Sequence, residues 1–175
     1  MSTNLQFIKS ETVTSGSSNF SVTNIFSSEY DVYYISLDAG QSGSAASDIN
    51  ARLLDSSSAE ISNSNYDYAN LRHTIGGSTT AEEKATGGDK FSSFIGLAAR
   101  TQANAGNGGS VYIYNPFSSS SYTFVNGNSI DTIGAKGSRY IGVLKETTSC
   151  TGIKFIPNNA SATLKTFRVD VYGVK

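Results

Sequence analysis

The stretch FRVDVYGV, residues 167–174, indicates the fold more clearly than any other part of the sequence. Its apolar side chains alternate with Arg168, Asp170 and Tyr172. Side chains of a β-strand point to opposite faces with a period of two, so one face of this stretch is aliphatic and aromatic and the other is polar. A slip of one residue would place the aliphatic side chains in water, which fixes the register. We predict a half-buried strand over residues 164–174.

The rest of the sequence repeats this pattern in short bursts. Segments with apolar side chains at alternate positions are separated by runs rich in Gly, Asn and Ser, the residues that favour turns. The further strands predicted in this way cover residues 5–7, 20–22, 30–39, 49–55, 91–99, 110–114, 122–125, 140–145 and 152–156. The assignment of residues 66–75 stays open.

The segment 30–39 shows an alternation in which neither face is strictly polar. Tyr33, Ile35 and Leu37 share one face, whereas Val32 and Tyr34 share the other. Aromatic and β-branched side chains on both sides suit a strand that is covered on both faces. We therefore expect both faces of this strand to be partly covered.

One helical turn is predicted, over about residues 79–88. Thr80 and Glu83 have the spacing of a capping box, in which the two side chains satisfy the first free N–H groups of a helix. Gly87 and Gly88 would end the helix. The turn is too short to be a major element of the fold.

Many short strands with almost no helix predict an all-β fold, an antiparallel β-sandwich of jelly-roll type with about ten strands. No long linker divides the chain, so residues 1–175 are expected to form a single domain. The N-terminal segment, about residues 1–14, is expected to be an assembly arm or an edge strand. The single cysteine, Cys150, cannot form an intramolecular disulfide.

The charges exclude several classes of partner. Thirteen basic and fourteen acidic residues give a net charge of -1, and neither sign forms a run. A phosphate backbone or an anionic membrane would need clustered Lys and Arg, so no direct binding of nucleic acid is expected. Residues 1–10 lack the apolar core of a signal peptide, and no apolar stretch is long enough for membrane insertion.

Candidate catalytic residues are few, and no enzymatic activity is expected. A hydrolase triad needs a base, and His73 is the only histidine. Cys150 has no charged neighbour in sequence to stabilise a thiolate, so we interpret it as a buried, inert thiol. A carboxylate pair for glycoside cleavage would be sought among Glu29, Asp31 and Asp38. The adjacent Glu82 and Glu83 are better explained by helix capping.

No metal or other cofactor is expected. Zinc requires several Cys or His ligands, which one residue of each type cannot supply. Calcium prefers carboxylate and amide oxygens, so Asp48, Asn50, Asp67 and Asn70 are the residues to consider. The same residue types form ordinary turns, and we prefer that interpretation.

Tyr112, Tyr114 and Tyr122, together with Asn115, are candidates for contact with a glycan. An aromatic ring stacks on the apolar side of a pyranose, while an amide binds its hydroxyl groups. Tyrosine is also favoured in strands and at subunit contacts, and this second interpretation is preferred.

Three stretches carry a resemblance to a known group of proteins. Residues 21–34, SVTNIFSSEYDVYY, resemble the F-S-S-x-Y-D-x-Y segment that precedes a long strand in small bacteriophage virion proteins with jelly-roll domains. Residues 151–157, TGIKFIP, followed by residues 167–174, are similar to the usual ending of those proteins, and residues 65–68 are a weaker echo. The group includes tail fibres, receptor-binding tips and head-surface decoration proteins.

The resemblance implies a non-enzymatic structural component of a bacteriophage virion, on the capsid surface or in the tail or fibre. Such a protein folds in the cytoplasm of the host bacterium, associates with itself, commonly as a homotrimer, and docks to other virion proteins. The alternative is a receptor-binding module of a tail fibre or tip that recognises a host surface glycan. A polysaccharide depolymerase is a third hypothesis, to which the sequence offers no closely spaced carboxylate pair.

Overall fold

The computed structural model describes residues 4–39, 47–74, 80–99, 107–131 and 136–175. Within these ranges the protein is all-β and contains no helix, so none spans a membrane. The strands are β1 Leu5–Val13, β2 Phe20–Val22, β3 Val32–Ala39, β4 Ser47–Leu54, β5 Tyr66–Thr74, β6 Thr80–Gly88, β7 Phe91–Ala99, β8 Asn107–Tyr114, β9 Thr123–Asp131, β10 Lys136–Leu144, β11 Gly152–Pro157 and β12 Phe167–Val174.

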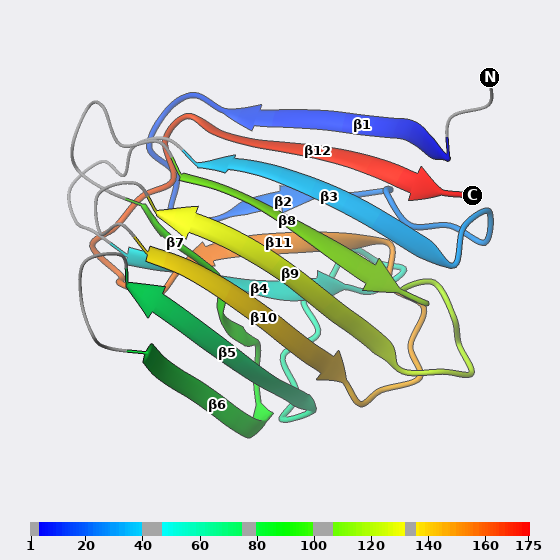
Figure 1. Ribbon diagram of the computed structural model, residues 1–175. Coiled ribbons are helices and arrows are strands. Elements are labelled where there is room, and N and C mark those ends of the chain that lie inside the picture. The colour runs from blue at the N-terminus through cyan, green and yellow to red at the C-terminus, as the bar shows by residue number, and fades with distance from the viewer. Residues whose placement is uncertain (1–3, 40–46, 75–79, 100–106, 132–135) are drawn as a thin grey trace.

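The strands form two antiparallel sheets that pack face to face (Figure 1). The eight-stranded sheet has the order β1-β12-β3-β8-β9-β10-β5-β6, and the four-stranded sheet has the order β2-β11-β4-β7. The predicted antiparallel sandwich of jelly-roll type is confirmed. Strand β1 lies at one edge of the large sheet and β6 at the other, and the small sheet covers only the inner face.

The core between the sheets is dominated by aromatic rings. Phe91 packs edge-on against Tyr66, with ring centroids 4.7 Å apart, and Phe94 packs against Tyr140 at 5.5 Å. The Tyr66 hydroxyl donates to the carbonyl of Ile61 at 2.9 Å, so this buried polar group is satisfied. Aromatic pairs of this kind add to the stabilisation from apolar burial.

Strands β3 and β12 pair along their whole length in the large sheet. Residues 33, 35 and 37 of β3 and 167, 169 and 171 of β12 all lie in the core, as their alternation predicts. On the opposite face, Val32 and Tyr34 are half-buried although no sheet covers them. The prediction of partial cover on both faces is thus correct, but on this side the cover comes from neighbouring side chains.

The stretches behind the virion-protein resemblance meet in the core. A Cβ atom on Gly173 would lie 2.6 Å from the Tyr30 ring, so glycine is required for this ring to pack against β12. The Tyr33 hydroxyl accepts from the N–H of Ser27 at 2.8 Å and donates to its carbonyl at 2.9 Å. These residues therefore fix the turn before β3 and its packing on β12.

The predicted helical turn over about residues 79–88 is wrong. Residue 79 lies outside the described residues, and residues 80–88 form β6, which pairs with β5. Thr80 pairs with His73 across this ladder, and Glu83 faces Asn70. The spacing of Thr80 and Glu83 gave a wrong prediction because the same polar residues favour the start of a helix and are tolerated in an edge strand that is exposed to solvent.

Candidate functional site

The outer face of the large sheet carries an extended surface without charge. The ladder brings into line Phe7, Tyr172, Tyr34, Tyr112, Asn126 and Ile141, from strands β1, β12, β3, β8, β9 and β10. Two residues further along each strand, a second line contains Leu5, Val174, Val32, Tyr114, Phe124 and Val143. We call these twelve residues the uncharged face. None of their side chains carries a charge at neutral pH, and in the described part of the chain no strand or loop packs over them.

Four rings of the first line touch one another in sequence across the strands. Phe7 packs edge-on against Tyr172 with centroids 5.7 Å apart, Tyr172 lies 6.0 Å from Tyr34, and Tyr34 lies 5.1 Å from Tyr112. Cross-strand aromatic pairs of this kind stabilise a sheet and hold each ring in place. The rings therefore present a preordered surface to the solvent.

Several of these side chains are strongly exposed for their type. Phe7 is 57% exposed, Ile141 55% and Phe124 48%, whereas Val125 and Tyr140, which point to the other side of β9 and β10, lie in the core. Single exposed apolar residues are ordinary, whereas a contiguous group of this extent is unusual on a surface that only faces water.

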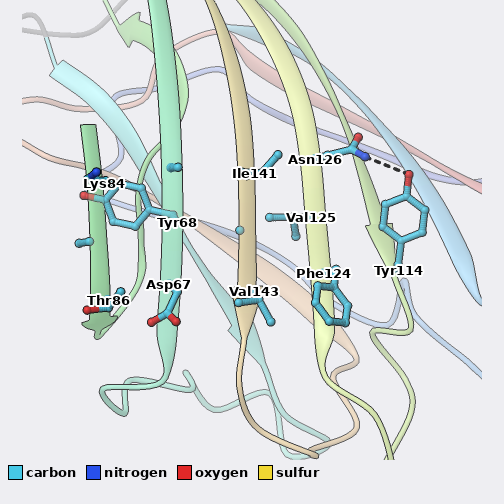
Figure 2. A pocket seen from close by; sticks show the side chains of 13 residues that line it. Asp67, Tyr68, Lys84, Thr86, Tyr114, Phe124, Val125, Asn126, Ile141 and Val143 are labelled. Atoms are coloured by element: carbon cyan, nitrogen blue, oxygen red, sulfur yellow. Dashed lines mark hydrogen bonds between the residues drawn. The ribbon is translucent and has the colours of Figure 1, made fainter. Parts of the chain in front are cut away.

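A groove of about 670 Å³ runs over one end of the uncharged face (Figure 2). Phe124 and Val143 line it on one side and Lys84 and Thr86 on the other, as Figure 2 shows. The groove forms because the strand register places the short side chain of Ala69 between the longer side chains of Ile141 on β10 and Lys84 on β6.

The structure brings together only two of the four predicted glycan-contact residues. Tyr112 and Tyr114 lie side by side on β8, with centroids 6.4 Å apart. Asn115 forms the turn after β8, where its backbone N–H donates to the carbonyl of Asp31 at 2.7 Å. Tyr122 is 44% exposed just before β9, and within the described residues it contacts neither of the other two rings.

The amide beside these two tyrosines belongs to Asn126 and not to Asn115, the residue predicted from the sequence. It lies opposite Tyr112 in the ladder, and its amide Nδ2 donates to the Tyr114 hydroxyl at 3.1 Å, which Figure 2 shows as a dashed line. The hydrogen bond orients the amide along the surface. One aromatic pair with one amide is the part of the uncharged face best suited to a sugar ring.

The candidate catalytic residues do not form a site. His73 is exposed on β5, and Cys150 is fully buried, which raises the pKa of its thiol to about 12. The Glu29 carboxylate accepts from the hydroxyl of Tyr30 at 2.8 Å. Asp31 and Asp38 lie at opposite ends of β3, about 23 Å apart at the usual rise per residue.

Three of the four calcium candidates share one neighbour, Ser93. Its hydroxyl donates to Asp48 at 3.1 Å, its N–H donates to the Asn50 side chain at 2.9 Å, and its carbonyl accepts from Asn70 at 3.4 Å. Ser93 has a positive φ of 46°, a conformation that this set of bonds holds in place.

The positive charge that balances the carboxylates of this cluster comes from the side chain of Arg72. Arg72 Nη2 lies 2.7 Å from Asp48 and 3.1 Å from Glu83, so a guanidinium occupies the position a cation would need. Asp67 lies elsewhere, paired with Lys145 at 2.9 Å, and this contact lowers its pKa. In the described ranges no three acidic, Cys or His side chains gather as metal ligands. The network ties β4 and β7 to β5 and β6.

The outer face of the small sheet carries a second charge network. Arg52 Nη1 lies 2.7 Å from Glu60, and its other terminal nitrogen contacts Asp89. Lys154, the neighbour of Arg52 in the ladder, also contacts Glu60. Hydrogen bonds from Lys154 and Arg52 lower the pKa of Glu60.

Comparisons with known proteins add no functional information. No family model and no curated protein sequence matches the chain. An exo-inulinase from Aspergillus awamori has a TM-score of 0.39 and 10% identity, covering 98% of this chain and 29% of that chain. A marine PL-14 alginate lyase from Aplysia kurodai has a TM-score of 0.34 and 10% identity, covering 85% of this chain and 70% of that chain. The chain thus spans under a third of the inulinase, and similarity this weak carries no argument.

Sequence reasoning missed most of the uncharged face, including Phe7, Phe124 and Ile141. A signal existed, because Val32 and Tyr34 are apolar at positions where a solvated strand face carries polar residues. The alignment of these side chains across strands depends on a register that one sequence does not specify.

Proposed function

We propose that this chain is a non-enzymatic structural component of a bacteriophage virion, on the capsid surface or in the tail or fibre. It acts by associating with itself and by docking to other virion proteins, after folding in the cytoplasm of the host. The observation that carries the proposal is the uncharged face. Interfaces are enriched in Tyr and Phe and depleted of charge at their centres, and this face has both properties.

Two further observations support the proposal. The residues behind the resemblance to virion proteins, such as Tyr30 and Gly173, have packing roles that a shared fold would require. The edges of the large sheet are protected, by exposed Glu82 and Lys84 on β6 and by a bulge after Phe7 on β1. Association through a sheet face is therefore favoured over association through a sheet edge.

The test is the mass of the purified protein in solution, measured by light scattering over a range of concentrations. A defined assembly larger than one 18.5 kDa chain is the expected result. A protein that stays monomeric at about 0.1 mM, well above the range of specific assembly affinities, would contradict self-association.

Glycan binding is the second candidate, and the pairing of Tyr112 and Tyr114 beside Asn126 favours it. It would make the chain a receptor-binding module of a tail fibre or tip. On a glycan array, Tyr112→Ala is expected to abolish a bound signal while Tyr122→Ala, outside the aromatic pair, leaves it unchanged. No bound glycan with the wild-type protein would remove this candidate.

A further inference from the structure

The uncharged face can pair with the same face of a second copy of the chain, and this restricts the choice of partner. It spans six strands, from β1 to β10, and its midline falls between β3 and β8. A two-fold axis along that midline, parallel to the strands, lays a second copy face to face on the first. Each line of residues then meets the same line of the other copy, in reverse strand order.

The resulting pairs match in size and polarity. In the first line, Tyr34 meets Tyr112 of the other copy, and Tyr172 meets Asn126, a hydroxyl opposite an amide. Phe7, the most exposed ring, meets Ile141 at the border of the groove. Phe7 of each copy thus lies beside the groove of the other copy, twice in one symmetric contact.

The second line pairs apolar side chains throughout. Leu5 meets Val143, Val174 meets Phe124, and Val32 meets Tyr114. Twisted sheets packed face to face align with their strands about 30° apart. Pairs near the axis therefore lie directly opposite each other, and pairs on the outer strands are neighbours that are offset along the strands.

Charge places no obstacle to this arrangement. The next line of the sheet, beyond the uncharged face, contains Asp170, Asn128 and Arg139. Across the axis, Asp170 of one copy meets Asn128 of the other, and Arg139 meets Ser10. Like charges do not meet across the axis in any of these lines. A face without charge has no like-charge repulsion to overcome. The contact then requires apolar complementarity and a hydrogen-bond partner for each buried tyrosine hydroxyl and for the Asn126 amide.

The available area is sufficient for a stable pair. Six strands at about 4.8 Å give a width of about 29 Å. The two lines of the uncharged face, together with the next line that contains Asp170 and Asn128, extend about 20 Å along the strands. Each copy would cover roughly 600 Å², so the contact totals roughly 1,200 Å², above the roughly 1,000 Å² that a specific interface needs.

We infer that the uncharged face binds a second copy of this chain, in a two-fold dimer with the large sheets face to face. The inference rests on the proposed function, since it names the partner in self-association. It replaces the homotrimer that the virion resemblance implies, because a face that is complementary to itself closes with two copies. Docking to other proteins then uses surfaces outside this contact.

Two charged variants test the pairing. Phe7→Asp and Ile141→Lys are each expected to weaken dimerisation at least 100-fold, measured by sedimentation velocity, because each buries an unpaired charge. Phe7 and Ile141 are both more than half exposed in the single chain, so the variants should fold, which far-ultraviolet circular dichroism checks. Five strand spacings, about 24 Å, separate the two sites within one chain, so they do not interact there.

Mixing the two variants is the decisive step. The mixed pair contains one opposite-charge contact and one wild-type contact of Phe7 with Ile141, so dimers are expected to return to within 10-fold of the wild-type affinity. Ile130→Asp is the matched control: Ile130 is 51% exposed on the same sheet face but lies beyond the uncharged face, and a change under 3-fold is expected.

The outcomes separate this inference from the proposed function. A wild-type trimer, or a dimer that neither variant weakens, would overturn the face-to-face pair and leave self-association standing. Two variants that dissociate and do not recover on mixing would also overturn the pairing. A wild-type monomer would contradict both.

Discussion

The outer face of the four-stranded sheet carries a network of ion pairs, whereas the outer face of the eight-stranded sheet has an uncharged, aromatic surface. On the small sheet, Arg52 and Lys154 share the carboxylate of Glu60. On the large sheet, aromatic rings of β1, β12, β3 and β8 touch one another and face the solvent. A network of paired charges is compatible with water as it stands, but a broad apolar face is stabilised further when a partner covers it. The contrast is the reason for proposing an interaction surface on the large sheet.

Arg52→Ala is expected to have the largest effect on stability, because it removes the centre of the small-sheet network. It leaves Glu60 and Asp89 without a guanidinium, and its side chain is only 20% exposed. We expect a loss of about 2 kcal/mol in the free energy of unfolding, measured in urea. Arg168→Ala, whose side chain is 57% exposed beside Asp170, is expected to cost under about 0.5 kcal/mol. Equal losses would contradict the difference between the two sites.

Acid should weaken the charged face and leave the uncharged face unaffected. The folded pKa of Glu60 lies below its ordinary value of 4.5, so its contribution is complete above about pH 4.5 and is lost as pH falls through the folded pKa. Glu60→Gln is expected to be less stable than wild type by about 1 kcal/mol at pH 7 and to approach it in stability at low pH. Urea midpoints between pH 7 and pH 3 measure this, and parallel curves would exclude the role of Glu60.

High salt is expected to weaken the ion pairs of the small sheet and to have little effect on the uncharged face. Raising NaCl from about 0.05 M to about 1 M shortens the screening length several-fold, yet the uncharged face has no charges to screen. Self-association is therefore expected to change less than 3-fold, measured by sedimentation equilibrium. A dimer that dissociates in high salt would show that ion pairs hold it together.

The smallest effect is expected from Ile141→Thr, which keeps a β-branched side chain on the exposed face of β10. Because Ile141 is 55% exposed, the isolated chain should lose less than about 0.5 kcal/mol, measured by thermal unfolding at a concentration where it is monomeric. A large loss in the monomer would mean that Ile141 has a packing role within the chain itself.

The sequence was sufficient for most of the fold. Period-two alternation predicts β3 and β12 because one face of each is buried. Of the twelve strands in the described residues, ten overlap a predicted segment, although β1 and β9 are much longer than predicted. Strand β5 lies in residues 66–75, whose assignment was open. Strand β6 was missed because Thr80, Glu83 and Gly87 satisfy the rules for a helix start and stop. Its polar side chains give no alternation to oppose them, since it lies at an edge.

The candidate site was less accessible to prediction. Tyr112 and Tyr114 were identified because aromatic residues suit a binding surface, but Asn115 belongs to a turn, and Asn126 holds the position beside the rings. The order of strands in the sheet decides which side chains become neighbours, and distant segments such as β1 and β12 meet only in the folded chain.

Strand β12 lies between β1 and β3, although both of those strands precede it by most of the chain. During synthesis the edge of β3 must therefore stay open until residues 167–174 leave the ribosome, and the line of rings lacks Tyr172 until then. Pairings between such distant segments make folding slow. Only a chain with β12 in place has a complete uncharged face, so we expect a chain that lacks residues 167–174 to fail in self-association.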